Sequence, residues 1–361
     1  MLRRKFSYIA AIIATLACLL SCSKDTENIL GEGTTVTLSF YTGEMQTRAT
    51  TPGDGVVADG GGIYRDGSGN PDLIILIAEA GTPGTIVKRY RGIGTSQDGN
   101  LVSSTATEAK VAFSFAGDPA GQYVVYALGN AQGLWPMIKE GDNDTDDSKV
   151  ITVDDLMNEV KVPTWEVLES LRFRKLAPNA APELINDRMP LSAEGELEVS
   201  SGKNGQVRLE LLRCIAKVTA EFINNTGEDL DLSNYRNEIV NICPNTGYII
   251  KHPAVSPESA SMGKLVAEVA EHNILHEGSI SRSWYVFPSV GPYTCDISFS
   301  ANEKAYDFPD LPVTDNKRVD IPCLYRNQQL HIVTRISKGF KVSFNFEVAD
   351  WDDVTADVQF D

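Results

Sequence analysis

The segment TTVTLSFYT, residues 34–42, places an apolar side chain at every second position: Val36, Leu38 and Phe40. Such alternation is typical of a β-strand with one face buried and the other in solvent. Similar short runs, separated by Gly, Asn, Asp and Pro, recur at 73–78, 85–91, 111–115, 122–128, 207–211, 215–222, 238–242, 284–287, 293–299, 329–336, 341–348 and 354–360. The sequence therefore predicts an all-β protein.

Helical spacing of apolar residues is confined to the middle of the chain. Residues 152–160 and 164–176 carry it, and Thr164 is placed to cap the second segment. We expect a minor helical connection within an otherwise all-β fold. The polar and glycine-containing run at 200–205 marks the expected boundary between two β-sandwich domains in tandem, at 49–204 and 205–361.

The amino-terminal residues have the layout of an export signal. Basic residues at 3–5 precede an apolar run at 6–20, which is too short for a permanent membrane span. Ser21 and Cys22 follow, and this ending resembles the lipobox of bacterial lipoproteins. We therefore expect residues 1–21 to be a signal peptide and the Cys22 sulfur to carry a lipid. The alternative is a plain signal peptide with an incidental cysteine.

The polar, acidic segment at 23–27 resembles the signal that directs lipoproteins of the Bacteroidota to the outer membrane. The alternative is a flexible tether. With 32 basic and 49 acidic residues the net charge is −17, and loss of the three basic residues at 3–5 brings it to −20. A surface this acidic repels nucleic acid and anionic lipid, so neither is an expected partner.

Motifs for catalysis or cofactor binding are not found in the sequence. Asp142, Asp144 and Asp146 are spaced like the start of a calcium loop, but Asp147 and Val153 stand where that loop needs glycine and glutamate. The glycine-rich runs lack the Lys-Ser/Thr of a phosphate loop. We therefore expect a protein that is not an enzyme and holds neither a cofactor nor a metal ion.

Four cysteines remain after the expected processing: Cys214, Cys243, Cys295 and Cys323. An exported protein meets an oxidising compartment, so disulfides among them are an expectation with three connectivities open. Cys214 and Cys295 fit equally well as small buried apolar residues.

A protease site follows the first strand. Arg48 and Ala49 precede a loop rich in proline and glycine, where an Arg-specific protease would have access.

Taken in order, these landmarks resemble the fimbrillin family, the FimA/Mfa-type pilins of Bacteroidia. The resemblance rests on the lipobox, on Arg48-Ala49 after one strand, and on segments 123–130 (YVVYALGN), 188–193 (RMPLSA), 209–218, 284–288 (WYVFP), 325–327 (YRN), 329–336 and 348–351 (VADW). It implies two transthyretin-like sandwiches, of which 209–218 would open the second. It also implies an outer-membrane lipoprotein precursor of a cell-surface fimbrium that supports adhesion.

The resemblance further implies a maturation step. An Arg-specific protease would cut between Arg48 and Ala49, and the propeptide 22–48 would leave with its strand. Loss of Val36, Leu38 and Phe40 would open an apolar groove, which a strand from another fimbrial subunit would fill by donor-strand exchange.

The donor is expected at the carboxy-terminal end. Val354, Ala356, Val358 and Phe360 alternate with polar residues in the spacing of the first strand. The other candidate, 341–348, is interpreted as an ordinary strand of the second domain. Whether the subunit belongs to the stalk, tip or anchor stays open. The competing hypothesis is a permanently anchored, glycan-binding surface lipoprotein, although the four tryptophans flank apolar runs and suit core packing better.

Overall fold

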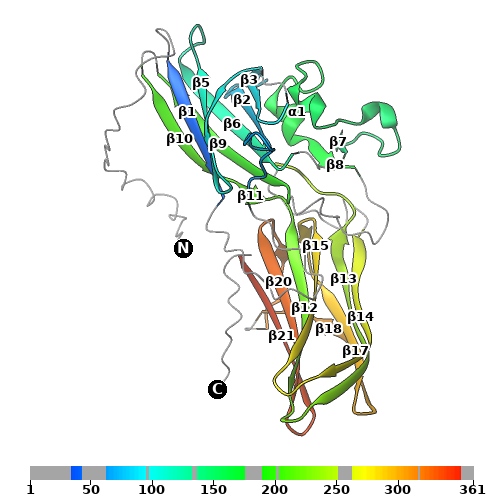
Figure 1. Ribbon diagram of the computed structural model, residues 1–361. Helices are drawn as coiled ribbons and strands as arrows, with labels where there is room; N and C mark the ends of the chain where they lie inside the picture. The colour runs from blue at the N-terminus through cyan, green and yellow to red at the C-terminus, as the bar shows by residue number, and fades with distance from the viewer. Residues whose placement is uncertain are drawn as a thin grey trace, which may run out of the picture.

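A computed structural model describes residues 34–42, 62–94, 97–131, 136–174, 189–200, 203–250, 262–315 and 318–350. Within these segments the chain forms two β-rich bodies arranged end to end (Figure 1). The prediction of an all-β fold with a minor helix is confirmed.

The first body contains a four-stranded sheet in the order β10-β1-β5-β4 and a five-stranded sheet in the order β11-β9-β6-β2-β3. Its strands are β1 (Thr35–Tyr41), β2 (Leu73–Glu79), β3 (Ile86–Arg91), β4 (Asn100–Ser104), β5 (Glu108–Ser114), β6 (Gly121–Gly129), β9 (Leu191–Val199), β10 (Gly205–Glu210) and β11 (Leu212–Arg213). The inward side chains of both sheets form one apolar core. β2 is buried along nearly its whole length, because the segment 137–173 contributes to a second core on its other side.

That covering segment contains three short helical elements: the 3₁₀ turns η1 (Asp147–Lys149) and η2 (Asp154–Met157), and the helix α1 (Trp165–Glu169). Two short strands, β7 (Met137–Lys139) and β8 (Leu171–Phe173), flank them. The predicted helix 152–160 is therefore a single 3₁₀ turn, and the predicted helix 164–176 ends at Glu169. Leu171 and Phe173 are fully buried in β8, which pairs with β7. Burial of these two side chains from a strand overrides the helical spacing.

The second body is a sandwich of two four-stranded sheets, β15-β12-β20-β21 and β14-β13-β17-β18. Its strands are β12 (Ala216–Asn225), β13 (Leu230–Pro244), β14 (Met262–Ile274), β15 (Ser279–Val286), β17 (Thr294–Ala301), β18 (Lys304–Pro312), β20 (Gln328–Ser337) and β21 (Lys341–Asp350). β16 (Ser289–Val290) and β19 (Cys323–Leu324) form a separate two-stranded sheet. As predicted, 341–348 lies in an ordinary strand of this sandwich, because β21 pairs along its length with β20.

The predicted boundary at 204/205 is wrong. β10 pairs in parallel with β1, and β11 pairs with β9, so both strands belong to the first body. The segment 209–218 does not open the second domain as a single strand either. It contains the end of β10, then β11, and the chain enters the second sandwich with β12 at Ala216.

Candidate functional site

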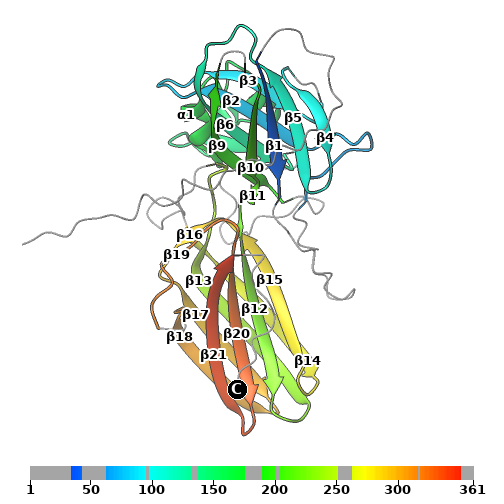
Figure 2. The ribbon, with the colours of Figure 1, turned by 90° about the vertical axis from the view of Figure 1, so that its left-hand side faces the viewer.

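The first strand occupies the interior of its sheet. β1 pairs with β5 on one side in antiparallel register and with β10 on the other side in parallel register (Figure 2). Because β1 has a neighbour on both edges, its removal would leave two unpaired strand edges facing one slot.

The inward face of β1 supplies part of the core. Val36 is 1% exposed, and Leu38 and Phe40 are fully buried among residues of both sheets. Burial of an aliphatic or aromatic side chain contributes roughly 1.5–3 kcal/mol, so these three contribute about 5–9 kcal/mol to the precursor. The sequence correctly predicted which face of this strand is buried.

The ends of β1 are fixed by polar contacts. At one end the Thr35 amide donates to the Asn204 side-chain oxygen at 3.2 Å. At the other end the Thr42 amide donates to the Thr107 carbonyl at 3.0 Å, and the Leu211 amide donates to the Tyr41 carbonyl at 2.8 Å. These contacts add to the strand pairing in fixing the register of β1 in its sheet.

The outward face of β1 is uncharged and half-buried. It consists of Thr35, Thr37, Ser39 and Tyr41. The Arg208 guanidinium of β10 lies 4.0 Å from the centre of the Tyr41 ring, a cation–π arrangement. The charged side chains on this face therefore come from the flanking strands.

Several predicted site residues lie outside the described residues. These are the lipidation site Cys22, the cleavage pair Arg48 and Ala49, and the donor positions Val354, Ala356, Val358 and Phe360. They stay predictions. β21 ends at Asp350, shortly before the predicted donor segment.

The four remaining cysteines lie among the described residues and none of them is in a disulfide there, so the expected disulfides are not formed. Cys214, Cys243 and Cys295 are buried, and Cys323 is half-buried. The Cys295 thiol donates to the Asn237 side-chain oxygen at 2.9 Å, and the Cys214 thiol donates to the Ile249 carbonyl at 3.3 Å. The alternative interpretation, small buried residues, describes Cys214 and Cys295.

These buried thiols predict alkaline destabilisation. Burial raises the pKa of Cys243 to about 11 and that of Cys295 to about 12, from an ordinary value of 9.0. The folded chain therefore keeps protons that the unfolded chain loses. The contribution of each protonated thiol to the free energy of unfolding is fully present below pH 9. Above pH 9 it falls by up to about 1.4 kcal/mol per pH unit for each thiol. Urea unfolding at pH 8, 9 and 10.5 measures this slope. A Cys243→Ala/Cys295→Ala variant should show a smaller slope, and an equal slope would contradict the assignment.

Two buried arginines join the bodies and were not predicted as site residues. The Arg326 guanidinium donates to the Arg213 carbonyl at 3.1 Å, to the Leu212 carbonyl at 3.0 Å and to the Ser192 hydroxyl at 2.5 Å. Arg213 is 1% exposed and donates to the Asn327 side-chain oxygen at 2.9 Å. The junction is thus a packed joint, whereas the sequence suggested a polar linker at 200–205.

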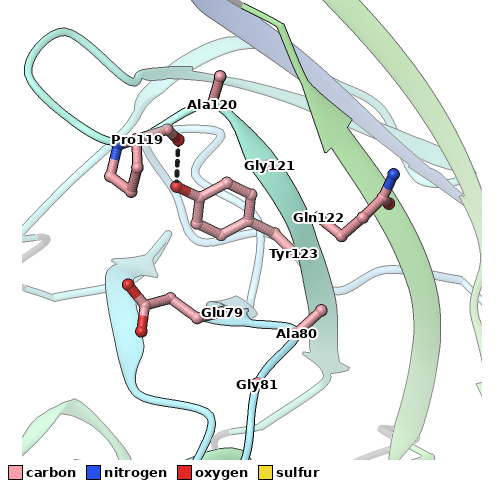
Figure 3. Close-up of a pocket in the computed structure, with 8 residues that line it drawn as sticks. All are labelled: Glu79, Ala80, Gly81, Pro119, Ala120, Gly121, Gln122 and Tyr123. Atoms are coloured by element: carbon pink, nitrogen blue, oxygen red, sulfur yellow. Dashed lines mark hydrogen bonds between the residues drawn. The ribbon is translucent and has the colours of Figure 1, made fainter.

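A shallow hollow of about 330 Å³ lies at one end of the first body (Figure 3). It is lined by Glu79, Ala80, Gly81, Pro119, Ala120, Gly121, Gln122 and Tyr123. The Tyr123 hydroxyl donates to the Pro119 carbonyl at 2.6 Å, so the phenol is already engaged. Burial, followed by the nearby carboxylates, raises the pKa of Tyr123. One carboxylate and one protonated phenol form no recognisable catalytic pair.

Among the described residues, no three His, Cys, Asp or Glu side chains gather as a metal-binding group. None of the helices in the same part of the chain has the length and apolar character to cross a bilayer.

Comparison with known proteins gives matches at the level of structure. No family model matches the chain, and no curated protein matches it. A tip fimbrial protein of Porphyromonas gingivalis matches at 10% identity and a TM-score of 0.46, over 88% of this chain and 100% of that one. A putative cell adhesion protein of Bacteroides eggerthii matches at 12% identity and a TM-score of 0.48, over 90% of this chain and 98% of that one. A fimbrillin of Porphyromonas gingivalis matches at 11% identity and a TM-score of 0.45, over 88% of this chain and 97% of that one. At these values the matches assign no role to any residue.

Proposed function

We propose that the protein is a fimbrial subunit, exported as an outer-membrane lipoprotein through Cys22, that polymerises at the cell surface by donor-strand exchange and supports adhesion. The observation that carries the proposal is the place of β1. It lies inside a sheet, supplies three buried side chains, and is followed by Arg48 outside the described residues. A segment that merely tethered the protein would not need to complete the core.

The slot geometry explains why excision would drive assembly. Loss of β1 leaves the backbone edges of β5 and β10 without partners and exposes the apolar side chains that surround Leu38 and Phe40. An incoming strand with alternating apolar residues would pair with both backbone edges and cover the exposed apolar side chains. The partner we propose is a second fimbrial subunit, whose segment 354–360 presents Val354, Ala356, Val358 and Phe360.

The glycan-binding alternative gains no support from the described tryptophans. The Trp165 indole donates to the Gly81 carbonyl at 3.1 Å, and Trp284 packs against the core of the second sandwich. Neither forms part of an exposed aromatic platform with the other, because they belong to different bodies.

An Arg48→Ala variant tests the proposal. Treatment of the full-length wild type with an Arg-specific protease should remove residues up to Arg48 and produce oligomers with Ala49 as the first residue. The variant should keep β1 and stay monomeric, as measured by mass spectrometry and light scattering. Arg65→Ala is the matched control, because Arg65 is an exposed arginine of the described residues that also precedes a glycine-containing segment. Equal oligomerisation of the Arg48→Ala variant would overturn the proposed maturation.

The donor assignment has its own arm in this experiment. A Phe360→Asp variant should be cleaved normally but should not assemble, because a carboxylate cannot enter the apolar slot. Gln359→Asp, on the opposite face of the same alternating segment, should assemble. Assembly of both variants would show that another segment is the donor.

A further inference from the structure

β10 depends on β1 for its place in the sheet. In the described strand order β1 is the one sheet neighbour of β10, whereas β5 also pairs with β4. Excision of β1, which rests on the function proposed above, therefore leaves β10 facing β5 across an empty strand position. The question is why the two edges would not simply pair with each other.

The backbone geometry would permit that closure. β10 is parallel to β1, and β1 is antiparallel to β5, so β10 and β5 are antiparallel. Leu38 lies between Val207 of β10 and Val111 of β5. A shift of one strand spacing, about 4.8 Å, would bring these two valines together on the inward face. Closure by β10 would thus hide much of the edge that an incoming strand needs.

The outward face opposes the same closure. Ser39 lies between Arg208 of β10 and Lys110 of β5, so closure would set these two cations directly opposite each other. Tyr41 likewise lies between Glu210 and Glu108, and closure would oppose these two acids. Like charges at directly opposite positions destabilise an antiparallel pair.

The register in which the edges would meet is constrained. A slip of one residue would turn Val207 and Leu209 from the core to solvent. A slip of two residues would pair Arg208 with Glu108, but it requires a displacement of about 7 Å along the strand. β11 follows directly and is held by pairing of Leu212 with Ser192, so β10 cannot slide this far without breaking that pairing.

We propose that these four charges, Glu108 and Lys110 on β5 and Arg208 and Glu210 on β10, keep the slot open after β1 leaves. Their repulsion disfavours pairing of β10 with β5 and leaves the empty strand position accessible to a strand from a second copy of the chain. In the precursor the uncharged Ser39 and Tyr41 separate the charged side chains of β5 from those of β10, so the repulsion arises only after excision.

A charge exchange on β10 tests this inference. In an Arg208→Glu/Glu210→Arg variant, closure would pair Glu with Lys110 and Arg with Glu108. The equilibrium between closed and open slots should then shift toward closure on the order of tenfold or more. Cleavage should be normal, and assembly should slow by a similar factor.

A second exchange restores the original relation. Adding Glu108→Lys and Lys110→Glu to the first variant again sets like charges opposite each other. It also keeps an ion pair within β5, where the Lys110 ammonium and the Glu108 carboxylate lie 3.3 Å apart. This four-residue variant should regain wild-type assembly. In the full-length forms β1 separates the charges of β10 from those of β5, so the three proteins should differ in thermal unfolding only by the loss of the contact between Arg208 and the Tyr41 ring, which both exchange variants share.

A cysteine pair reports closure directly. Val111→Cys and Val207→Cys lie two strand spacings apart in the precursor, about 10 Å, which is beyond disulfide reach. After cleavage at concentrations too low for assembly, the first exchange variant should form this disulfide at least several-fold faster than the wild type, and the four-residue variant should not. Equal rates in all three, or assembly unaffected by the first exchange, would overturn the inference.

Failure of the proposed maturation can be distinguished from failure of this inference. If the protease leaves β1 in place, the maturation is wrong. The charges are then tested in uncleaved chains carrying Leu38→Asp and Phe40→Asp. We expect these substitutions to displace β1 from the sheet, because unpaired carboxylates are costly to bury at these positions. The same ranking of disulfide rates is expected there, and equal rates would again contradict the inference.

Discussion

Replacement of Phe40 by alanine is expected to lower the free energy of unfolding of the full-length chain by about 3–5 kcal/mol. The side chain is fully buried in the first core, and its loss would leave a cavity between the side chains of the two sheets. Urea unfolding of the precursor, followed by tryptophan fluorescence, measures the change. It is among the largest effects that a single substitution in this chain should produce.

The informative part of this experiment is the comparison with the cleaved protein. Because β1 leaves with the propeptide, cleaved Phe40→Ala and cleaved wild-type subunits are chemically identical and should be equally stable and assemble equally well. Ser39→Ala is the control, since Ser39 lies on the outward face of the same strand and should change the precursor by less than about 0.5 kcal/mol. A Phe40→Ala precursor as stable as the wild type would show that β1 does not complete the core in solution.

The strands that were predicted best are those with a single buried face. β1 is the clearest case, because the alternation of Val36, Leu38 and Phe40 specifies a strand and also its inward side. β21 was placed correctly for a different reason: its pairing partner, β20, is the preceding strand in sequence. Local patterns suffice where a strand pairs with its neighbour along the chain.

The domain boundary could not be obtained from such patterns. Val207, Leu209 and Leu211 alternate like any strand, and nothing in the alternation says which sheet they join. Their actual partner in the sheet is β1, far away in sequence. Long-range parallel pairing leaves no local signal, so a polar run at 200–205 was mistaken for the linker.

The prediction of a helix over residues 164–176 was wrong beyond Glu169 for a related reason. Trp165, Leu168 and Leu171 have helical spacing, while Leu171 and Phe173 also fit a strand. Pairing of β8 with β7 decides between the two, and it depends on residues that are distant from the segment. The charged rows beside Ser39 and Tyr41 were missed because only the register of three strands brings them together.

The joint between the two bodies leads to the second large prediction. Replacement of Arg326 by alanine should lower the free energy of unfolding by about 2–4 kcal/mol. The change would leave the Leu212 carbonyl and the Ser192 hydroxyl without the guanidinium that they contact now. Buried polar groups that lose their partner cost about 1–3 kcal/mol each, which partial access of water would reduce. Arg326→Lys should recover little, because an ammonium group cannot reach several acceptors with the planar fork of arginine.

The distinctive consequence concerns cooperativity. Phe287, which follows β15 of the second body, shares a core with residues of the first body, and the Arg326 guanidinium donates to the carbonyl of Ile250, a member of the same core, at 3.4 Å. Loss of the guanidinium should therefore split denaturant unfolding into two transitions. It should also broaden the distribution of interatomic distances obtained from small-angle X-ray scattering. Arg282→Ala is the matched control, since Arg282 is exposed on β15. If Arg326→Ala unfolds in one transition at the wild-type midpoint, the two bodies are held together by the apolar contacts alone, and the arginine has no part in fixing their relative orientation.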